Sequence, residues 1–127
     1  MDVKLKKWFR PNIDKEILKT LSKKSDIKGL KHVGVYFGLL SFFGYLAYFT
    51  WGTWWSVFWF YIYGNIFCFC NPIWHETGHK TAFKTKFLNE IFYYISCFMA
   101  YFEPTRWRFT HFVHHGNTYS TKNPYDH

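Results

Sequence analysis

The sequence predicts an all-α membrane protein, with one transmembrane helical hairpin plus interfacial helices that carry two clusters of histidine. The first reason is that no Asp, Glu, Lys or Arg occurs between Lys31 and Glu76. Soluble domains seldom leave such a length uncharged, whereas two bilayer crossings of roughly 20 apolar residues each require it. The second reason is aromatic content, because Phe, Tyr and Trp make up 26% of the chain. The mean hydropathy of −0.22 understates this apolar character, since that scale counts Trp and Tyr as polar.

Residues 1–31 form a basic N-terminal segment, with ten Lys or Arg against four Asp or Glu and so a net charge of +6. Beside a transmembrane stretch, this charge favours a cytoplasmic flank under the positive-inside rule, and we expect no nucleic-acid partner. Asn12 is the expected N-cap of an amphipathic helix in this segment. Its apolar positions recur at helical spacing, with lysines mostly on the other side. Such a helix either lies on an anionic membrane surface or packs, solvated, on the rest of the protein. The apolar positions are Ile13, Ile17, Leu18 and Leu21.

The transmembrane hairpin is predicted at about residues 33–71. Its first span runs from Val33 to Thr50, a turn follows at Gly52, and its second span runs from Trp54 to Cys70. Several tryptophans gather at the turn, where indole rings prefer the membrane interface. Because the hairpin starts on the basic side, its second leg returns there. The N-terminus and the two histidine-containing segments, at residues 75–79 and 111–115, are therefore expected at the cytoplasmic face of an integral membrane protein.

Either two or three further helices are expected after the hairpin, depending on whether a new helix starts at Asn71-Pro72. Asn71-Pro72 marks either a helix start or a kink. The apolar stretch 87–102 is too short and too polar for a full crossing, so we expect an interfacial or half-buried helix there. Glu103-Pro104 ends it, and Thr105 is the expected cap of a last helix that ends at Gly116. The tail 118–127 is polar and has no periodicity.

The three cysteines lie in apolar surroundings and are expected to be reduced and buried. They are Cys68, Cys70 and Cys97.

Five of the seven histidines fall into two clusters with helical spacing. His75 and His79 are four residues apart, so both imidazoles face one side of a helix. In the second cluster, His111 is followed by His114 and His115, again within one turn. Both clusters are predicted at the same membrane face. So many imidazoles with few carboxylates suit iron, copper, zinc or nickel rather than magnesium or calcium, which prefer oxygen ligands.

The segment His75-Glu76-x-x-His79 also satisfies the pattern of zinc metalloproteases, in which two histidines bind zinc and the glutamate is the general base. A membrane zinc hydrolase is therefore an alternative. It leaves the three histidines of residues 111–115 without a role, because zinc has no room for five imidazoles. A second alternative is a non-catalytic remnant hairpin without a metal function.

The pattern HxxxH after a transmembrane hairpin, followed by HxxHH about 30 residues later, resembles the first two histidine boxes of the membrane-bound fatty acid desaturase and hydroxylase superfamily. The runs from His79 to Glu90 and from Glu103 to His111 also resemble its bacterial desaturase members, and the resemblance covers roughly residues 30–126. It implies a non-haem di-iron centre at the cytosolic face that uses O₂ to oxidise C–H bonds of lipid acyl chains. It also implies an acyl-lipid substrate and a ferredoxin- or cytochrome-type electron donor. The implied iron ligands are His75, His79, His111, His114 and His115.

The family pattern has a third histidine box, which these 127 residues do not contain. Residues 32–127 are therefore interpreted as a partial desaturase-like domain, and we expect the chain to be the N-terminal part of such an enzyme and inactive as an isolated polypeptide. The resemblance leaves open whether the reaction is desaturation, hydroxylation or ketolation. Glu76 is a candidate to orient a ligating imidazole. A basic rim is expected near the site, formed by Lys80, Lys84, Lys86, Arg106 and Arg108.

Overall fold

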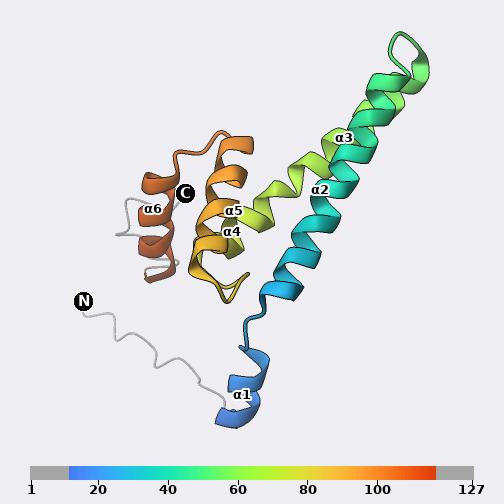
Figure 1. The fold of residues 1–127 in the computed structure, drawn as a ribbon. Helices are drawn as coiled ribbons and strands as arrows, with labels where there is room; N and C mark the ends of the chain where they lie inside the picture. The colour runs from blue at the N-terminus through green and yellow to red at the C-terminus, as the bar shows by residue number, and fades with distance from the viewer. Residues whose placement is uncertain (1–11, 117–127) are drawn as a thin grey trace.

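The computed structural model describes residues 12–116, and all regular structure in this range is helical (Figure 1). The prediction of an all-α fold is confirmed for these residues. The predictions that fall on residues 1–11 and on the tail 118–127 lie outside the described residues. The helices are α1 (Lys15–Leu21), α2 (Asp26–Phe49), α3 (Trp54–Cys68), α4 (Cys70–Gly78), α5 (Lys86–Met99) and α6 (Pro104–Gly116).

Helix α1 is capped by Asp14, whose carboxylate accepts the backbone N–H groups of Glu16 and Ile17. The predicted cap at Asn12 is wrong by two positions, because Asp14 also provides an N-cap oxygen and its negative charge suits the helix N-terminus. The predicted apolar positions are all at least half exposed. The described residues therefore leave the apolar side of α1 uncovered.

Helix α2 begins at Asp26 rather than at Val33, because Ser25 caps it and accepts the N–H of Lys28. The predicted boundary between residues 31 and 32 therefore falls inside a continuous helix. With 24 residues, α2 is the one helix in the described part of the chain that is long and apolar enough to cross a membrane. Helix α3 has 15 residues, or about 22 Å, and falls short of a hydrocarbon core of about 30 Å.

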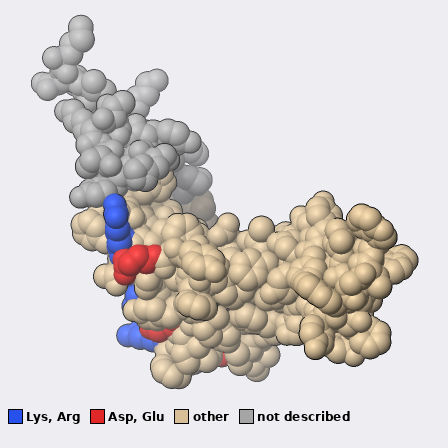
Figure 2. All heavy atoms as spheres, turned by 90° about the horizontal axis from the view of Figure 1, so that it is seen from above, with Lys and Arg blue, Asp and Glu red and all other residues tan. Residues whose placement is uncertain are grey.

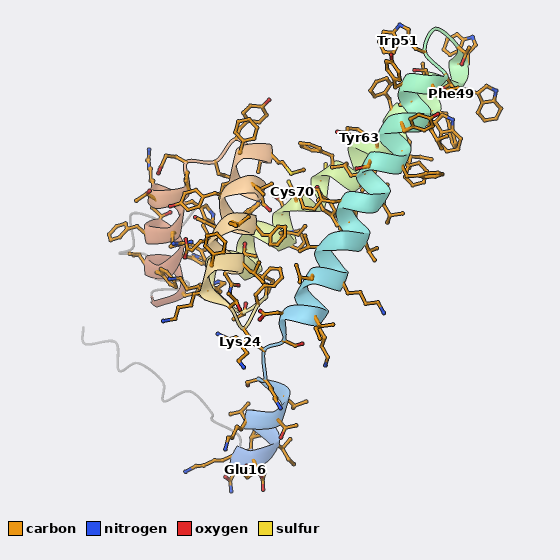
Figure 3. The ribbon with its side chains drawn as sticks, in the orientation of Figure 1. Glu16, Lys24, Phe49, Trp51, Tyr63 and Cys70 are labelled. Atoms are coloured by element: carbon orange, nitrogen blue, oxygen red, sulfur yellow. The ribbon has the colours of Figure 1, made fainter. Side chains whose placement is uncertain are left out.

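Helices α2 and α3 lie side by side and run in opposite directions (Figure 1). The Ser56 hydroxyl donates to the carbonyl of Ala47 at 3.1 Å near the turn. The Tyr36 hydroxyl donates to the carbonyl of Phe67 at 3.2 Å farther along the pair. Gly52 has a φ of 82° in the turn, a conformation that costs a glycine little. Tryptophans surround this turn as predicted, and Trp51 lies at its tip in Figure 3.

The second leg ends earlier than predicted, at Cys68, with Phe69 between α3 and α4. Helix α4 then starts at Cys70, so that Asn71 and Pro72 lie inside its first turn. Pro72 is tolerated there because the first N–H groups of a helix have no partner within the helix. One helix therefore ends and a new one starts before Asn71-Pro72. Of the two possibilities left by the sequence, a helix start or a kink, the structure shows a helix start.

All three cysteines are free thiols, as predicted. Cys70 and Cys97 are buried, but the prediction of burial is wrong for Cys68, which is exposed. The reason is that Cys68 lies at the end of α3, a helix with only one buried residue, Ser56.

Charged side chains gather at one end of the molecule. On the face seen in Figure 2, the end formed by α2 and α3 shows no charged side chain, while Lys, Arg, Asp and Glu appear toward the other end. This agrees with the uncharged sequence between Lys31 and Glu76. The apolar pair and the charged end are therefore two chemically different regions.

The loop after α4 joins the two regions. Asp26 at the start of α2 accepts the N–H and the hydroxyl of Thr85, both at 2.8 Å. Gly29 lets this loop approach α2 closely, since a Cβ there would lie 2.6 Å from the Phe83 ring. Phe83 is fully buried, and Asn89 accepts its N–H and donates to its carbonyl. The α4–α6 region is thereby fixed to the base of α2.

Candidate metal centre

Helix α4 carries the first histidine box. His79 is its C-cap and donates its backbone N–H to the carbonyl of His75. The two rings therefore lie one turn apart, with centroids separated by 4.7 Å. Lys80 then has a φ of 60°, which turns the chain away from the helix axis. Both imidazoles therefore lie next to each other at the C-terminal end of α4.

Helix α6 carries the second box and starts at Pro104. The carboxylate of Glu103 accepts the backbone N–H of Thr105 at 3.0 Å and that of Arg106. The predicted cap at Thr105 is therefore wrong: Glu103 caps the helix, and Pro104 occupies the first position, where its missing N–H costs nothing. The hydrogen bond from the Arg106 N–H, followed by that from the Thr105 N–H, lowers the pKa of Glu103. Desolvation raises this pKa by less, so the net shift is downward.

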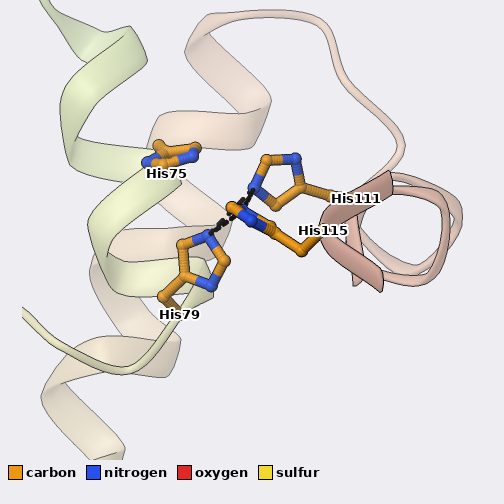
Figure 4. A group of neighbouring side chains, drawn as sticks. All are labelled: His75, His79, His111 and His115. Atoms are coloured by element: carbon orange, nitrogen blue, oxygen red, sulfur yellow. Dashed lines mark hydrogen bonds between the residues drawn. The ribbon is translucent and has the colours of Figure 1, made fainter. Parts of the chain in front are cut away.

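Four histidines from the two boxes converge on one point (Figure 4). One ring nitrogen of each lies within 4.8 Å of the others. The three Nε2 atoms of His79, His111 and His115 are closer still. Their separations are 2.9 Å for His79–His111, 3.0 Å for His111–His115 and 3.2 Å for His79–His115. The four residues are His75, His79, His111 and His115.

Hydrogen bonds alone cannot satisfy this triangle of Nε2 atoms. A neutral imidazole nitrogen either carries a proton and donates or has a lone pair and accepts. Around three mutually adjacent nitrogens, at most two of the three contacts can pair a donor with an acceptor. The third contact sets two N–H groups or two lone pairs against each other at about 3 Å. A cation between them would accept all three lone pairs.

The nitrogen separations also fit a shared metal ion. A metal–imidazole bond is about 2.0–2.1 Å long, so two nitrogens on one ion lie about 2.9 Å apart at a right angle and about 3.4 Å apart at the tetrahedral angle. The three observed separations, 2.9–3.2 Å, fall between these limits. The residues present therefore fit a transition-metal ion, for which imidazole is a suitable ligand.

Burial and the neighbouring imidazoles keep the rings of His79 and His111 neutral. Burial, and then the neighbouring His75 and His115, lower the pKa of His111 to about 4. Burial is also the first cause that lowers the pKa of His79, followed by His75 and His115. At neutral pH both rings are therefore unprotonated, which is the form that binds metals.

The structure does not bring the fifth predicted ligand, His114, into this group. Its ring centroid lies 6.1 Å from that of His111 and 5.9 Å from that of His115. A step of three residues turns a helix by about 300° and a step of four by about 400°, so His114 and His115 leave His111 on opposite sides. A ligand role for His114 remains a prediction.

Glu76 lies beside the group without a close contact to it. Its carboxylate is 3.8 Å from Nδ1 of His75, beyond hydrogen-bond range. The other carboxylate oxygen accepts the hydroxyl of Thr81 at 2.7 Å. The role predicted for Glu76, orienting a ligand, remains a prediction.

Part of the predicted basic rim is neutralised. Lys80 and Arg108 both pair with Glu90 on α5, at 3.4 Å and 3.1 Å. The guanidinium of Arg108 also lies over the Tyr93 ring, 4.1 Å from its centroid. Glu90 thus connects the residue after the first box with a residue one turn before His111.

Sequence reasoning missed Trp107, whose indole stacks on the His111 ring with centroids 4.4 Å apart and an interplanar angle of 17°. The signal was present, because Trp107 precedes His111 by four residues and so shares its helix face. It also missed Gly78, which no pattern singled out.

The family model described as fatty acid desaturase matches residues 49–127. This range contains both histidine boxes and helices α3 to α6. None of the curated proteins compared with the chain matches it. Among the solved structures there is no match either.

Proposed function

Since the chain belongs to the fatty acid desaturase family, we propose that its converging histidines bind iron for the O₂-dependent oxidation of C–H bonds in lipid acyl chains. The family implies iron, a lipid substrate and an electron donor. The proposed ligands in this chain are His75, His79, His111 and His115.

The observation that carries the proposal is the triangle of Nε2 atoms, at 2.9–3.2 Å, which hydrogen bonds cannot fully satisfy. When bound, iron would supply the redox chemistry of the reaction. The chain's own contribution is to hold neutral imidazoles at metal-binding distances. The family's two-iron centre needs more ligands than these four, and we propose His114 as one of them.

The apolar pair α2–α3 provides the membrane context of this proposal. We propose that α2 crosses the bilayer, that α3 returns beside it, and that the tryptophan-rich turn lies at the far interface. The histidines then lie at the cytoplasmic face, near the basic end of α2, where an acyl chain reaches them without leaving the bilayer. A ferredoxin- or cytochrome-type protein is the proposed electron donor.

The geometry does not favour the zinc hydrolase alternative. A hydrolase would need Glu76 beside the metal as a general base. Here the Glu76 carboxylate accepts the Thr81 hydroxyl and is 58% exposed. The group also offers four histidines, whereas a catalytic zinc typically has three protein ligands and an open position for water.

The test is the metal content of the purified full chain in nanodiscs after expression with added iron, measured by plasma emission. We expect iron in the wild-type chain and none in a variant with alanine at all four clustered histidines. Circular dichroism checks that both proteins keep their helices. One equivalent of zinc without iron would support the hydrolase, and absence of any metal would support a remnant hairpin; either result contradicts the proposal.

A further inference from the structure

We propose that Trp107 sets the orientation of the His111 ring at the metal centre and that Gly78 provides the space this requires. Trp107 is then a positioning residue, which acts on the metal through His111. The inference rests on the proposed function, because it needs His111 to be a ligand. It goes further by assigning a role to two residues that are not themselves ligands.

The Trp107 indole is held between the two boxes. One side stacks on the His111 imidazole at 4.4 Å, nearly parallel to it. Its ring also meets Trp74 on α4 edge-on, with centroids 4.2 Å apart. Offset-stacked and edge-on arrangements are the favourable ones for aromatic pairs. Because Trp74 and His75 are neighbours on α4, the position of the indole fixes His111 relative to the first box.

Gly78 of α4 lies against the indole. A Cβ at this position would lie 2.8 Å from Cζ3 of Trp107 and 3.2 Å from Cε2 of Tyr93. Gly78 is buried in the last turn of α4 and lacks a positive φ. Its backbone conformation is therefore open to any residue. Glycine is required at this position only because the indole leaves no room for a Cβ.

Helix propensity does not explain the glycine at residue 78. Alanine is more favourable than glycine in a helix interior, by about 0.5–1 kcal/mol. Residue 78 is the last residue of α4 and lacks a positive φ, so the helix gives glycine no advantage there, and the contact with Trp107 is what opposes a larger residue.

The contact is also adjacent to the metal ligands. Gly78 directly precedes His79, and Trp107 lies one turn before His111. The Nε2 atoms of these two histidines are 2.9 Å apart. Ordinary van der Waals contact between carbons is about 3.5–4.0 Å, so a methyl group at residue 78 must displace the indole, and His111 with it.

The experiment measures Co²⁺ binding to the full chain in nanodiscs, followed by the visible absorption of the bound ion. Gly78→Ala is expected to weaken binding at least tenfold and to change the spectrum. The double variant Gly78→Ala/Trp107→Phe is expected to recover much of the affinity, because the smaller ring leaves room for the methyl group. Non-additivity of the two changes then measures their coupling. The matched control is Gly64→Ala, since a Cβ at this glycine of α3 meets nothing within 4 Å.

Each outcome decides the inference. Wild-type affinity and spectrum in Gly78→Ala, or a double variant no better than Gly78→Ala, would overturn it while leaving the proposed metal centre intact. A wild-type chain that binds no Co²⁺ would overturn both. Should Gly78→Ala lose helicity by circular dichroism, Trp107→Phe alone decides: an altered spectrum supports the inference and an unchanged one overturns it.

Discussion

The α2–α3 pair and the α4–α6 region are built in different ways. Along α2 and α3 only four residues are buried, and large aromatic side chains such as Trp54 and Phe49 are mostly exposed. Helices α4 and α5 bury eight residues, including the polar side chains of Thr77, Asn89 and Ser96. Each of these three polar groups has a hydrogen-bond partner. In the proposed topology lipid covers the first region, whereas the second is held by contacts within the chain.

The difference indicates which region is more sensitive to substitution. Substitutions at the exposed positions of α2 and α3 should be tolerated, because they remove no buried contact. The second region instead combines buried hydrogen bonds, one ion-pair network and close ring contacts around the histidines. Substitutions in that region are therefore expected to have larger effects, and four substitutions test this contrast.

The largest effect is expected from His79→Ala, which removes a corner of the Nε2 triangle. Iron or Co²⁺ binding should weaken by at least a factor of 100, as measured by titration of the full chain. The matched control is His32→Ala, because His32 on α2 is not one of the clustered histidines. Equal affinities of the two variants would contradict the assignment of the site.

Asn89→Ala should be the most destabilising change in the scaffold. The side chain is 1% exposed, and its amide makes three hydrogen bonds, to the N–H and the carbonyl of Phe83 and to the carbonyl of Thr85. Leaving these groups unpaired costs about 2 kcal/mol. Denaturant unfolding should show this loss.

The comparison variant for Asn89 is Asn65→Ala on α3, where the exposed amide makes one bond to the Tyr61 carbonyl. It should change the free energy of unfolding by less than about 0.5 kcal/mol. If Asn65→Ala lowered the free energy of unfolding more than Asn89→Ala, the contrast between the two regions would be contradicted.

Glu90→Gln should cost about 1 kcal/mol, since Glu90 and its partners are partly exposed. Desolvation raises the pKa of Glu90, but the hydrogen bonds and charges of Arg108 and Lys80 outweigh it and lower the pKa below 4.5. A lowered carboxyl pKa contributes stability above about pH 4.5, and this contribution is lost as the pH falls through the folded-state value. The difference between wild type and variant should therefore be present at pH 7 and shrink below pH 4.5; a pH-independent difference would contradict the ion-pair explanation.

The smallest effect is expected from Trp54→Ala. Its side chain is 87% exposed at the turn between α2 and α3. Metal affinity should stay at the wild-type value, while the membrane-bound fraction in a vesicle flotation assay should fall slightly. A marked loss of metal affinity would mean that the two regions are energetically coupled.

Local geometry explains which parts of this structure could be predicted. The four-residue spacing places His75 with His79 and His111 with His115, because both pairs depend on one helix turn. The helix starts were less predictable. Asn12 and Asp14 are competing caps of similar strength, and in the last helix Pro104 takes the first position, which makes Glu103 the cap although Thr105 is the commoner cap residue. The choice between them depends on neighbouring residues that the pattern does not weigh.

The meeting of the two boxes depends on tertiary contacts, which helical spacing does not contain. His79 and His111 are 32 residues apart. Contacts between helices accompany their meeting: Trp107 lies against Gly78, and Glu90 pairs with Lys80 and Arg108. A single sequence provides no periodicity that would reveal such contacts.

The most direct test of the central claim is X-ray absorption at the iron edge of the iron-loaded full chain. A metal held by the converging histidines should show a first shell of nitrogen at about 2.1 Å with the multiple scattering typical of imidazole, from three or more histidines. His79→Ala should reduce this imidazole signal. A shell of oxygen or sulfur without imidazole scattering, or a spectrum unchanged by His79→Ala, would contradict the claim that the converging histidines hold the metal.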